Sequence, residues 1–257
     1  MADTRGIADR IVDAYRTGTP IAPIRGEISG AGPAYAIQQQ TIARWTKAGR
    51  RIVGRKIGLT SKAVQSQLGV NEPDYGVIFG DTVLPDGAVA AAGSVMQPRV
   101  EAEIAFVLAR DLVGQKITPE QVIAATDFVR PALEICGSRI AQWDIKIEDT
   151  IADNASAGLV VLGPHRETPD LARLAAVGMV MHKNGEPVAQ GRGDACLGNP
   201  AIAVAWLAET LTRLGEGLRA GDLVMSGALA KMVAAEPGSR FTAEFEGMGK
   251  VSIAFAT

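Results

Sequence analysis

The sequence predicts an α+β fold in which a small helical N-terminal part, residues 1–50, precedes a β-rich body, residues 51–257. Near the N-terminus, apolar residues recur at helical spacing. From residue 51 onward, short apolar runs alternate with glycine, proline and aspartate, which is typical of strands and turns. Strands and helices do not alternate regularly, which disfavours a parallel sheet built from βα units. A mixed, largely antiparallel and strongly curved sheet fits this pattern better.

Two helices are predicted in the N-terminal part. Residues 3–17 carry Ile7 and Ile11 at helical spacing, and prolines soon after them end the helix. Pro33 suits the first turn of a second helix that runs to about Lys47. The body therefore follows a short helical segment.

The apolar runs of the body are the predicted strands. They are bounded by turn-forming residues and are short, as strands in a curved sheet usually are. They fall at residues 52–57, 77–79, 100–108, 129–136, 159–162, 177–183, 223–226, 241–245 and 251–255.

Helices are predicted between some of these strands. Thr118 begins a capping-box pattern ahead of residues 122–126. Asn199, followed by a proline, opens a helix over residues 201–214, which a glycine ends. A hydroxyl side chain at position 60 or 61 would cap a further helix that runs through residue 68.

Composition excludes several classes of function. The net charge is -2 with no lysine-arginine run, so no nucleic-acid or membrane footprint is indicated. Cys136 and Cys196 lie in apolar runs and are interpreted as buried, inert thiols of a cytoplasmic protein. No signal-peptide pattern and no apolar run of about 20 residues occurs. His165 and His182 lack partners at metal-ligand spacing, which disfavours zinc chemistry and a Ser-His-Asp triad.

Two acids share one face of the predicted strand 100–108. Because side chains alternate along a strand, Glu101 and Glu103 lie on the face opposite Ile104. Like charges this close repel each other, and burial adds to the cost. A solvated edge strand with two exposed glutamates would explain the pair without any ligand, and this alternative stays open for the pair alone.

A third acid favours a metal site. Glu134 is the single acid in the apolar run 128–136, where a glutamate is seldom left without a partner. Together with Glu101 and Glu103 it gives three carboxylates with no histidine or thiolate, a donor set that suits Mg²⁺ or Mn²⁺.

Other polar residues have two interpretations each. Lys56 is either a surface lysine or a cation that points into a pocket, where burial would lower its pKa. Asp74 by itself reads as a turn residue. A capped turn explains Asp153 and Asn154, and Ser156 has no histidine to activate it, although it can hydrogen-bond a ligand.

Several motifs together resemble the 2-keto-4-pentenoate (2-hydroxypenta-2,4-dienoate) hydratases, which belong to the fumarylacetoacetate hydrolase-like superfamily. The resemblance extends from the N-terminal helices to the last strand, and it is specific for a group of hydratases and related decarboxylases. The motifs are GRKIGLTSK from residue 54, LGVNEPDYG from 68, QPRVEAEIA from 97, DTIADNAS from 149, GRG from 191, CLGNP from 196 and SGAL from 226.

The resemblance implies a fold, an activity and a set of roles. The fold is a curved, barrel-like β roll of the fumarylacetoacetate hydrolase C-terminal type in a homo-oligomer. The activity is hydration of 2-hydroxypenta-2,4-dienoate to 4-hydroxy-2-oxopentanoate in meta-cleavage catabolism of aromatic compounds. The implied roles are metal binding by Glu101, Glu103 and Glu134 (Mg²⁺ or Mn²⁺), catalysis by Lys56 and Asp74, and substrate binding by Ser156 and Leu59.

Two alternatives remain at this level. A 4-oxalocrotonate-type decarboxylase of the same group would use the same chelation, and the sequence around residues 226–233 favours hydration instead. A non-catalytic partner that stabilises such a decarboxylase in a mixed oligomer is a different class of protein. The intact Lys56, Asp74 and three glutamates argue against that class.

Overall fold

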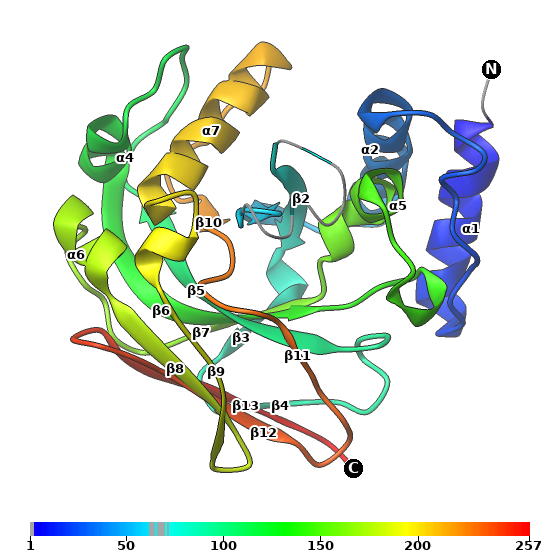
Figure 1. The fold of residues 1–257 in the computed structure, drawn as a ribbon. Coiled ribbons are helices and arrows are strands. Elements are labelled where there is room, and N and C mark those ends of the chain that lie inside the picture. The colour runs from blue at the N-terminus through cyan, green and yellow to red at the C-terminus, as the bar shows by residue number, and fades with distance from the viewer. Residues whose placement is uncertain (1–2, 62–64, 66–69, 71) are drawn as a thin grey trace.

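A computed structural model describes residues 3–61, 65, 70 and 72–257 of the chain. The predicted N-terminal helices are present as α1 (Thr4–Thr17) and α2 (Ala31–Lys47). They lie beside α5 (Ile147–Ala152) at one side of the molecule (Figure 1). Buried side chains of α1 and α2 share an apolar core with Ile151 of α5. The division between residues 1–50 and 51–257 stays a prediction, because this core joins the two parts.

The larger sheet curls back on itself. Its strand order is β2-β1-β10-β5-β6-β7-β3, with β11 paired to β5, and most neighbours are antiparallel. The short 3-10 turn η1 (Gly80–Thr82) connects β2 directly to β3, which stand at opposite ends of this order. The predicted curved sheet is thus confirmed. Its strands are β1 (Ile52–Gly58), β2 (Asp74–Phe79), β3 (Val83–Pro85), β5 (Arg99–Leu108), β6 (Thr126–Cys136), β7 (Leu159–Leu162), β10 (Leu223–Met225) and β11 (Val233–Ala234).

A second sheet and three helices cover one face of the larger sheet (Figure 1). The second sheet has the order β4-β13-β12-β8-β9, and its apolar face shares the main core with the larger sheet and with helix α7. The elements of this layer are β4 (Ala88–Ala90), β8 (Gly178–Lys183), β9 (Glu186–Arg192), β12 (Arg240–Phe245), β13 (Gly249–Phe255), α4 (Pro119–Ala125), α6 (Leu171–Ala176) and α7 (Pro200–Arg213).

Strand β5 buries residues on both of its faces. Ile104 and Phe106 enter the main core. Ala105 belongs to a smaller core on the opposite face, together with Ala132 of β6 and Met225 of β10. Because Glu101 and Glu103 alternate in phase with Ala105, the acids stand on the same face as this smaller core. One face of β5 therefore packs in the main core, and the other face carries the two acids next to the smaller apolar core.

Two of the three capping predictions are confirmed. Thr118 and Gln121 form the reciprocal capping box of α4, and Asn199 caps α7 with proline at its first position. Strand β2 starts at Asp74, three residues before the predicted start, and α5, α6, β3, β4, β9 and β11 were not predicted. The predicted helix through residue 68 falls mostly outside the described residues. In the described part of the chain, no helix is long and apolar enough to cross a membrane.

Candidate metal and catalytic site

The three predicted metal ligands meet on neighbouring strands. Glu101 of β5 lies directly opposite Glu134 of β6 in the antiparallel register, so their side chains share one face. Glu103 follows on the same face, and Glu103 and Glu134 are buried. Strand β5 lies between β6 and β10, so the alternative of a solvated edge strand is wrong. The fold therefore brings the three acids together, as predicted.

Buried like charges dominate the electrostatics of this cluster. Burial raises the pKa of Glu101 to about 7, and the neighbouring charge of Glu134 adds to the shift. Burial, and then the charges of Glu134 and Glu101, also raise the pKa of Glu103. Among the described residues, the carboxylates of Asp74 and the three glutamates interact with one ammonium group, that of Lys56. A bound cation would offset this excess of negative charge.

Lys56 points into the cluster and is not a surface lysine. The residue is only 4% exposed. Its Nζ lies 3.4 Å from Glu134 Oε1 and donates a hydrogen bond of 2.9 Å to the carbonyl oxygen of Ala155. The prediction of a lowered pKa for Lys56 is wrong. Burial does lower it, but the nearby carboxylates, Glu134 first among them, raise the pKa above its ordinary value.

Asp74 is the first residue of β2 and not a turn residue, which corrects the interpretation from sequence. It is 1% exposed and lies opposite Gly58 in the register with β1. Burial raises the pKa of its carboxyl, whereas the charge of Lys56 lowers it. A Cβ atom on Gly58 would stand 2.2 Å from Asp74 Oδ1. The absence of a side chain at Gly58 is therefore what lets Asp74 lie against β1.

A strained turn presents Ser156 and the carbonyl of Ala155 to this site. Asn154, Ala155 and Ser156, which form η3 (Asn154–Ser156), have φ values of 53°, 51° and 55°. Consecutive non-glycine residues rarely adopt this left-handed conformation, and such strain persists only where the surroundings enforce it. The Asn154 side chain accepts from the N–H of Val77 and donates to the Val77 carbonyl, which fixes the turn on β2.

A buried ion pair holds the same turn from the other side. The carboxylate of Asp153 accepts from both the backbone N–H and the Nε of Arg139. Arg139 also donates to the carbonyl oxygens of Asp153 and Ala157, and it stacks 4.1 Å over the ring of Tyr15. Asp153 is thus a tether to Arg139, which corrects its interpretation as part of a simple capped turn. Sequence reasoning did not identify Arg139.

The donor set fits a hard divalent cation. Within the described residues, Glu103 Oε1 and Glu134 Oε2 are buried and have no hydrogen-bond partner. Oxygens of Glu101 and Glu134 lie within 4.8 Å of each other and of Cys136 Sγ, while Glu103 lies outside that group. Burial raises the pKa of Cys136 well above its ordinary value, and its Sγ donates to Glu101 at 3.5 Å. Cys136 is therefore a protonated neighbour of the cluster, which the sequence analysis missed.

Leu59 directly follows β1 in a left-handed conformation, with φ of 59°. Its carbonyl oxygen accepts a hydrogen bond of 2.8 Å from the Gln65 side chain. The residue is half-buried and follows Gly58, which lies opposite Asp74 in the register. Its predicted contact with substrate stays a prediction.

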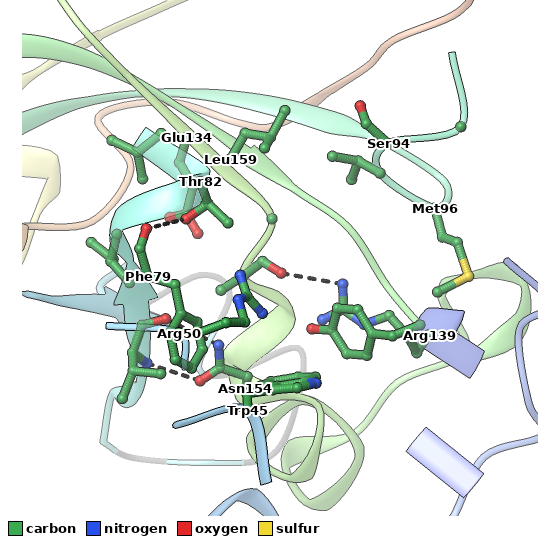
Figure 2. A pocket seen from close by; sticks show the side chains of 18 of the residues that line it. Trp45, Arg50, Phe79, Thr82, Ser94, Met96, Glu134, Arg139, Asn154 and Leu159 are labelled. Carbon is green, nitrogen blue, oxygen red and sulfur yellow. Dashed lines mark hydrogen bonds between the residues drawn. The ribbon is translucent and has the colours of Figure 1, made fainter. Parts of the chain in front are cut away.

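A cavity of about 160 Å³ touches the cluster at Glu134 (Figure 2). Lys56 and Asp74 do not line it within the described part of the structure. Arg50 stacks on Phe79 in its wall, with 4.0 Å between the guanidinium carbon and the ring centre. Its lining includes Trp45, Arg50, Phe79, Thr82, Ser94, Met96, Glu134, Arg139, Asn154 and Leu159.

Comparison with known proteins agrees with this geometry. The profile of the fumarylacetoacetate (FAA) hydrolase C-terminal family matches residues 51–255. The chain therefore belongs to the fumarylacetoacetate hydrolase family. Within that family it is 50% identical, over 250 residues, to the 2-keto-4-pentenoate hydratase of Paraburkholderia xenovorans (strain LB400). That alignment covers 96% of this chain and 93% of the relative.

Two solved structures are also similar. The 4-oxalocrotonate decarboxylase from Pseudomonas putida G7, complexed with magnesium and adipate, matches with a TM-score of 0.93 and 34% identity, over 98% of this chain and 97% of that chain. Fumarylpyruvate hydrolase from Pseudomonas aeruginosa, in complex with Mn²⁺ and pyruvate, matches with a TM-score of 0.61 and 18% identity, over 80% of this chain and 89% of that chain. The second likeness concerns the fold alone.

Proposed function

We propose that this protein is a metal-dependent hydratase that adds water to 2-hydroxypenta-2,4-dienoate and releases 4-hydroxy-2-oxopentanoate. One observation carries the proposal: the chain is 50% identical to a 2-keto-4-pentenoate hydratase over nearly its full length. Its identity to the decarboxylase of nearly the same fold is lower, at 34%. The reaction class is therefore hydro-lyase, in the breakdown of aromatic compounds by meta-cleavage.

Glu101, Glu103 and Glu134 would hold the cation, Mg²⁺ or Mn²⁺. The buried oxygens without partners on Glu103 and Glu134 support this, because each would otherwise remain desolvated at a cost of about 1–3 kcal/mol or more. When bound, the cation would supply Lewis-acid polarisation of the carboxylate and 2-oxygen of the substrate.

Lys56 and Asp74 are the groups that would move protons. Hydration first removes the proton of the 2-hydroxyl group and delivers one to C5, the terminal carbon. Water then adds at C4 and loses a proton, while C3 gains one. Lys56 has three N–H groups: one donates to the Ala155 carbonyl, and the ammonium group also forms an ion pair with Glu134, so a further N–H is available to donate. Asp74 Oδ1 is buried and has no partner within the described residues, so it can accept. One donor and one acceptor thus flank the glycine at position 58.

Two further properties belong to this proposal. The protein would act as a homo-oligomer and would also associate with a related decarboxylase. It would work in the cytoplasm, where the buried, free thiols of Cys136 and Cys196 stay reduced.

The test is turnover by the purified protein alone. A panel of 2-hydroxydienoates of different chain length is supplied with Mg²⁺ or Mn²⁺, and loss of diene absorbance is followed together with release of CO₂. Hydration predicts loss of absorbance without CO₂. Release of CO₂ in proportion to substrate loss would identify the decarboxylase instead. Absence of turnover with every substrate and both metals would favour a non-catalytic partner.

A further inference from the structure

The hydroxyl of Thr150 lies between two residues of the proposed active site. Thr150 stands on α5, is 4% exposed, and its Oγ1 lies 3.3 Å from Asp74 Oδ2 and 3.3 Å from Ser156 Oγ. It belongs to the motif DTIADNAS from residue 149, but the sequence analysis assigned it no role. It is nevertheless the residue through which Asp74 and Ser156 are connected.

Four threonines that lie in a helix or directly after one use their hydroxyls differently. Those of Thr17, Thr46, Thr126 and Thr212 each donate to the carbonyl oxygen four residues earlier, at 2.7–3.0 Å. The carbonyl oxygen four residues earlier is the usual local acceptor for the hydroxyl of a helical threonine. The Thr150 hydroxyl instead donates across to Asp74. Its orientation is set by the site and not by its own helix.

The direction of the hydrogen bonds follows from counting protons. A hydroxyl carries one proton, and that of Thr150 is donated to Asp74. The bond between Thr150 and Ser156 must therefore use the Ser156 proton, which gives a chain that runs from Ser156 through Thr150 to Asp74. With its proton committed, Ser156 offers only lone pairs to a ligand. It suits a water molecule or a substrate hydroxyl, and not a carboxylate or an oxyanion.

The hydrogen bonds that anchor α5 hold Thr150 in a fixed position. The carboxylate of the preceding residue, Asp149, accepts from the backbone N–H groups of Ile24, Arg25 and Lys146 and from the Arg25 side chain. The segment between α1 and α2 thus anchors the helix that carries Thr150. Asp74 Oδ2 is held while Asp74 Oδ1 stays without a partner in the described part of the chain.

We propose that Thr150 is a positioning residue for the hydration reaction: its hydroxyl holds Asp74 with one oxygen free to accept, and it turns Ser156 into an acceptor for the attacking water. This inference rests on the proposed function. Thr150 would act through Asp74 and Ser156 without touching the reacting atoms. Its loss should therefore reduce turnover, while leaving the cation and ground-state binding of substrate nearly unchanged.

Two variants at position 150 and one control separate positioning from packing. Thr150→Val keeps the shape but removes the hydroxyl, and Thr150→Ser keeps the hydroxyl but removes a methyl group. Thr126→Val removes a buried threonine hydroxyl that bonds to its own helix, far from the site. The measurements are kcat and KM for the dienoate, Mn²⁺ affinity by calorimetry, and Tm.

We expect Thr150→Val to lower kcat about 10- to 100-fold, with KM and Mn²⁺ affinity within about threefold of wild type. Thr150→Ser should restore kcat to within about threefold, and Thr126→Val should leave kcat within about twofold. The positioning role alone is overturned if Thr150→Val keeps the wild-type kcat. It is also overturned if Thr150→Ser lowers kcat as much as Thr150→Val does. Wild-type protein that hydrates no dienoate refutes the proposed function, and this inference falls with it.

Discussion

Adding one methyl group at Gly58 should disable the site without replacing any proposed functional residue. A Cβ atom there would stand 2.2 Å from Asp74 Oδ1, and Lys56 Nζ would lie 3.3 Å away. Contacts below 3.0 Å do not persist, so the Asp74 carboxylate must retreat by at least 0.8 Å, the difference between 3.0 and 2.2 Å. Because Thr150 holds the other oxygen, the retreat also breaks or bends that hydrogen bond.

The expected effect of Gly58→Ala follows from this displacement. Misplacing a catalytic group by about 1 Å can lower the rate about 100-fold, so we expect a loss of kcat of that order. Overpacking at a buried site costs about 1–3 kcal/mol in the free energy of unfolding, which should lower Tm by several degrees. Metal affinity should stay close to wild type, since the three glutamates stand on β5 and β6.

The assay compares Gly58→Ala with Gly80→Ala by steady-state kinetics, Mn²⁺ titration and thermal unfolding. A Cβ atom on Gly80 would meet the end of Val53 at 3.1 Å and the carbonyl oxygen of Arg51 at 3.8 Å, so this control tests the same substitution just after the far end of β2. Gly80→Ala should keep kcat within about twofold. Wild-type kcat in a folded Gly58→Ala variant would refute the inference that the position of Asp74 limits turnover.

Three further predictions concern the charged residues. Glu103→Gln should remove Mn²⁺ binding and activity together, and full activity in excess chelator would contradict the metal site. Lys56→Ala should lower kcat about 10²- to 10⁴-fold with metal affinity nearly intact, whereas simple loss of metal would make Lys56 structural. The pKa of Glu101 is about 7, raised by burial, so below pH 7 the cation must displace a proton. Because burial raises the pKa of Glu103 as well, apparent Mn²⁺ affinity, measured by calorimetry from pH 5.5 to 8, should fall as pH decreases, by about tenfold or more per pH unit below about 7. An affinity independent of pH across that range would contradict this titration.

Stability of the metal-free protein should depend on pH through the same carboxyl group. The pKa of Glu101 is raised in the folded state, so its contribution is fully present below its ordinary value of 4.5 and is lost as pH rises through about 7. A bound cation would offset that loss, because it favours the ionised carboxylate.

The strands and caps could be predicted because their signals are local. Alternation along residues 100–108 assigned Glu101 and Glu103 to one face, and the core on the other face confirms it. Thr118 and Asn199 cap helices through bonds that span two or three residues, which the sequence displays directly. Short strands such as β3 and β11 escaped prediction because a few residues carry no detectable period.

By itself, the sequence determined which residue types were available to the site: three glutamates in apolar runs, one lysine in a strand, and no suitable histidine. Only the tertiary structure decided their partners. Asp74 reads as a turn residue until β2 pairs with β1, and its hydrogen-bond partner, Thr150, is 76 residues away. The physical reason is that strand alternation fixes the face of a side chain within its own strand. Register and the anchoring of α5 fix what stands opposite it, and those contacts have no local signature.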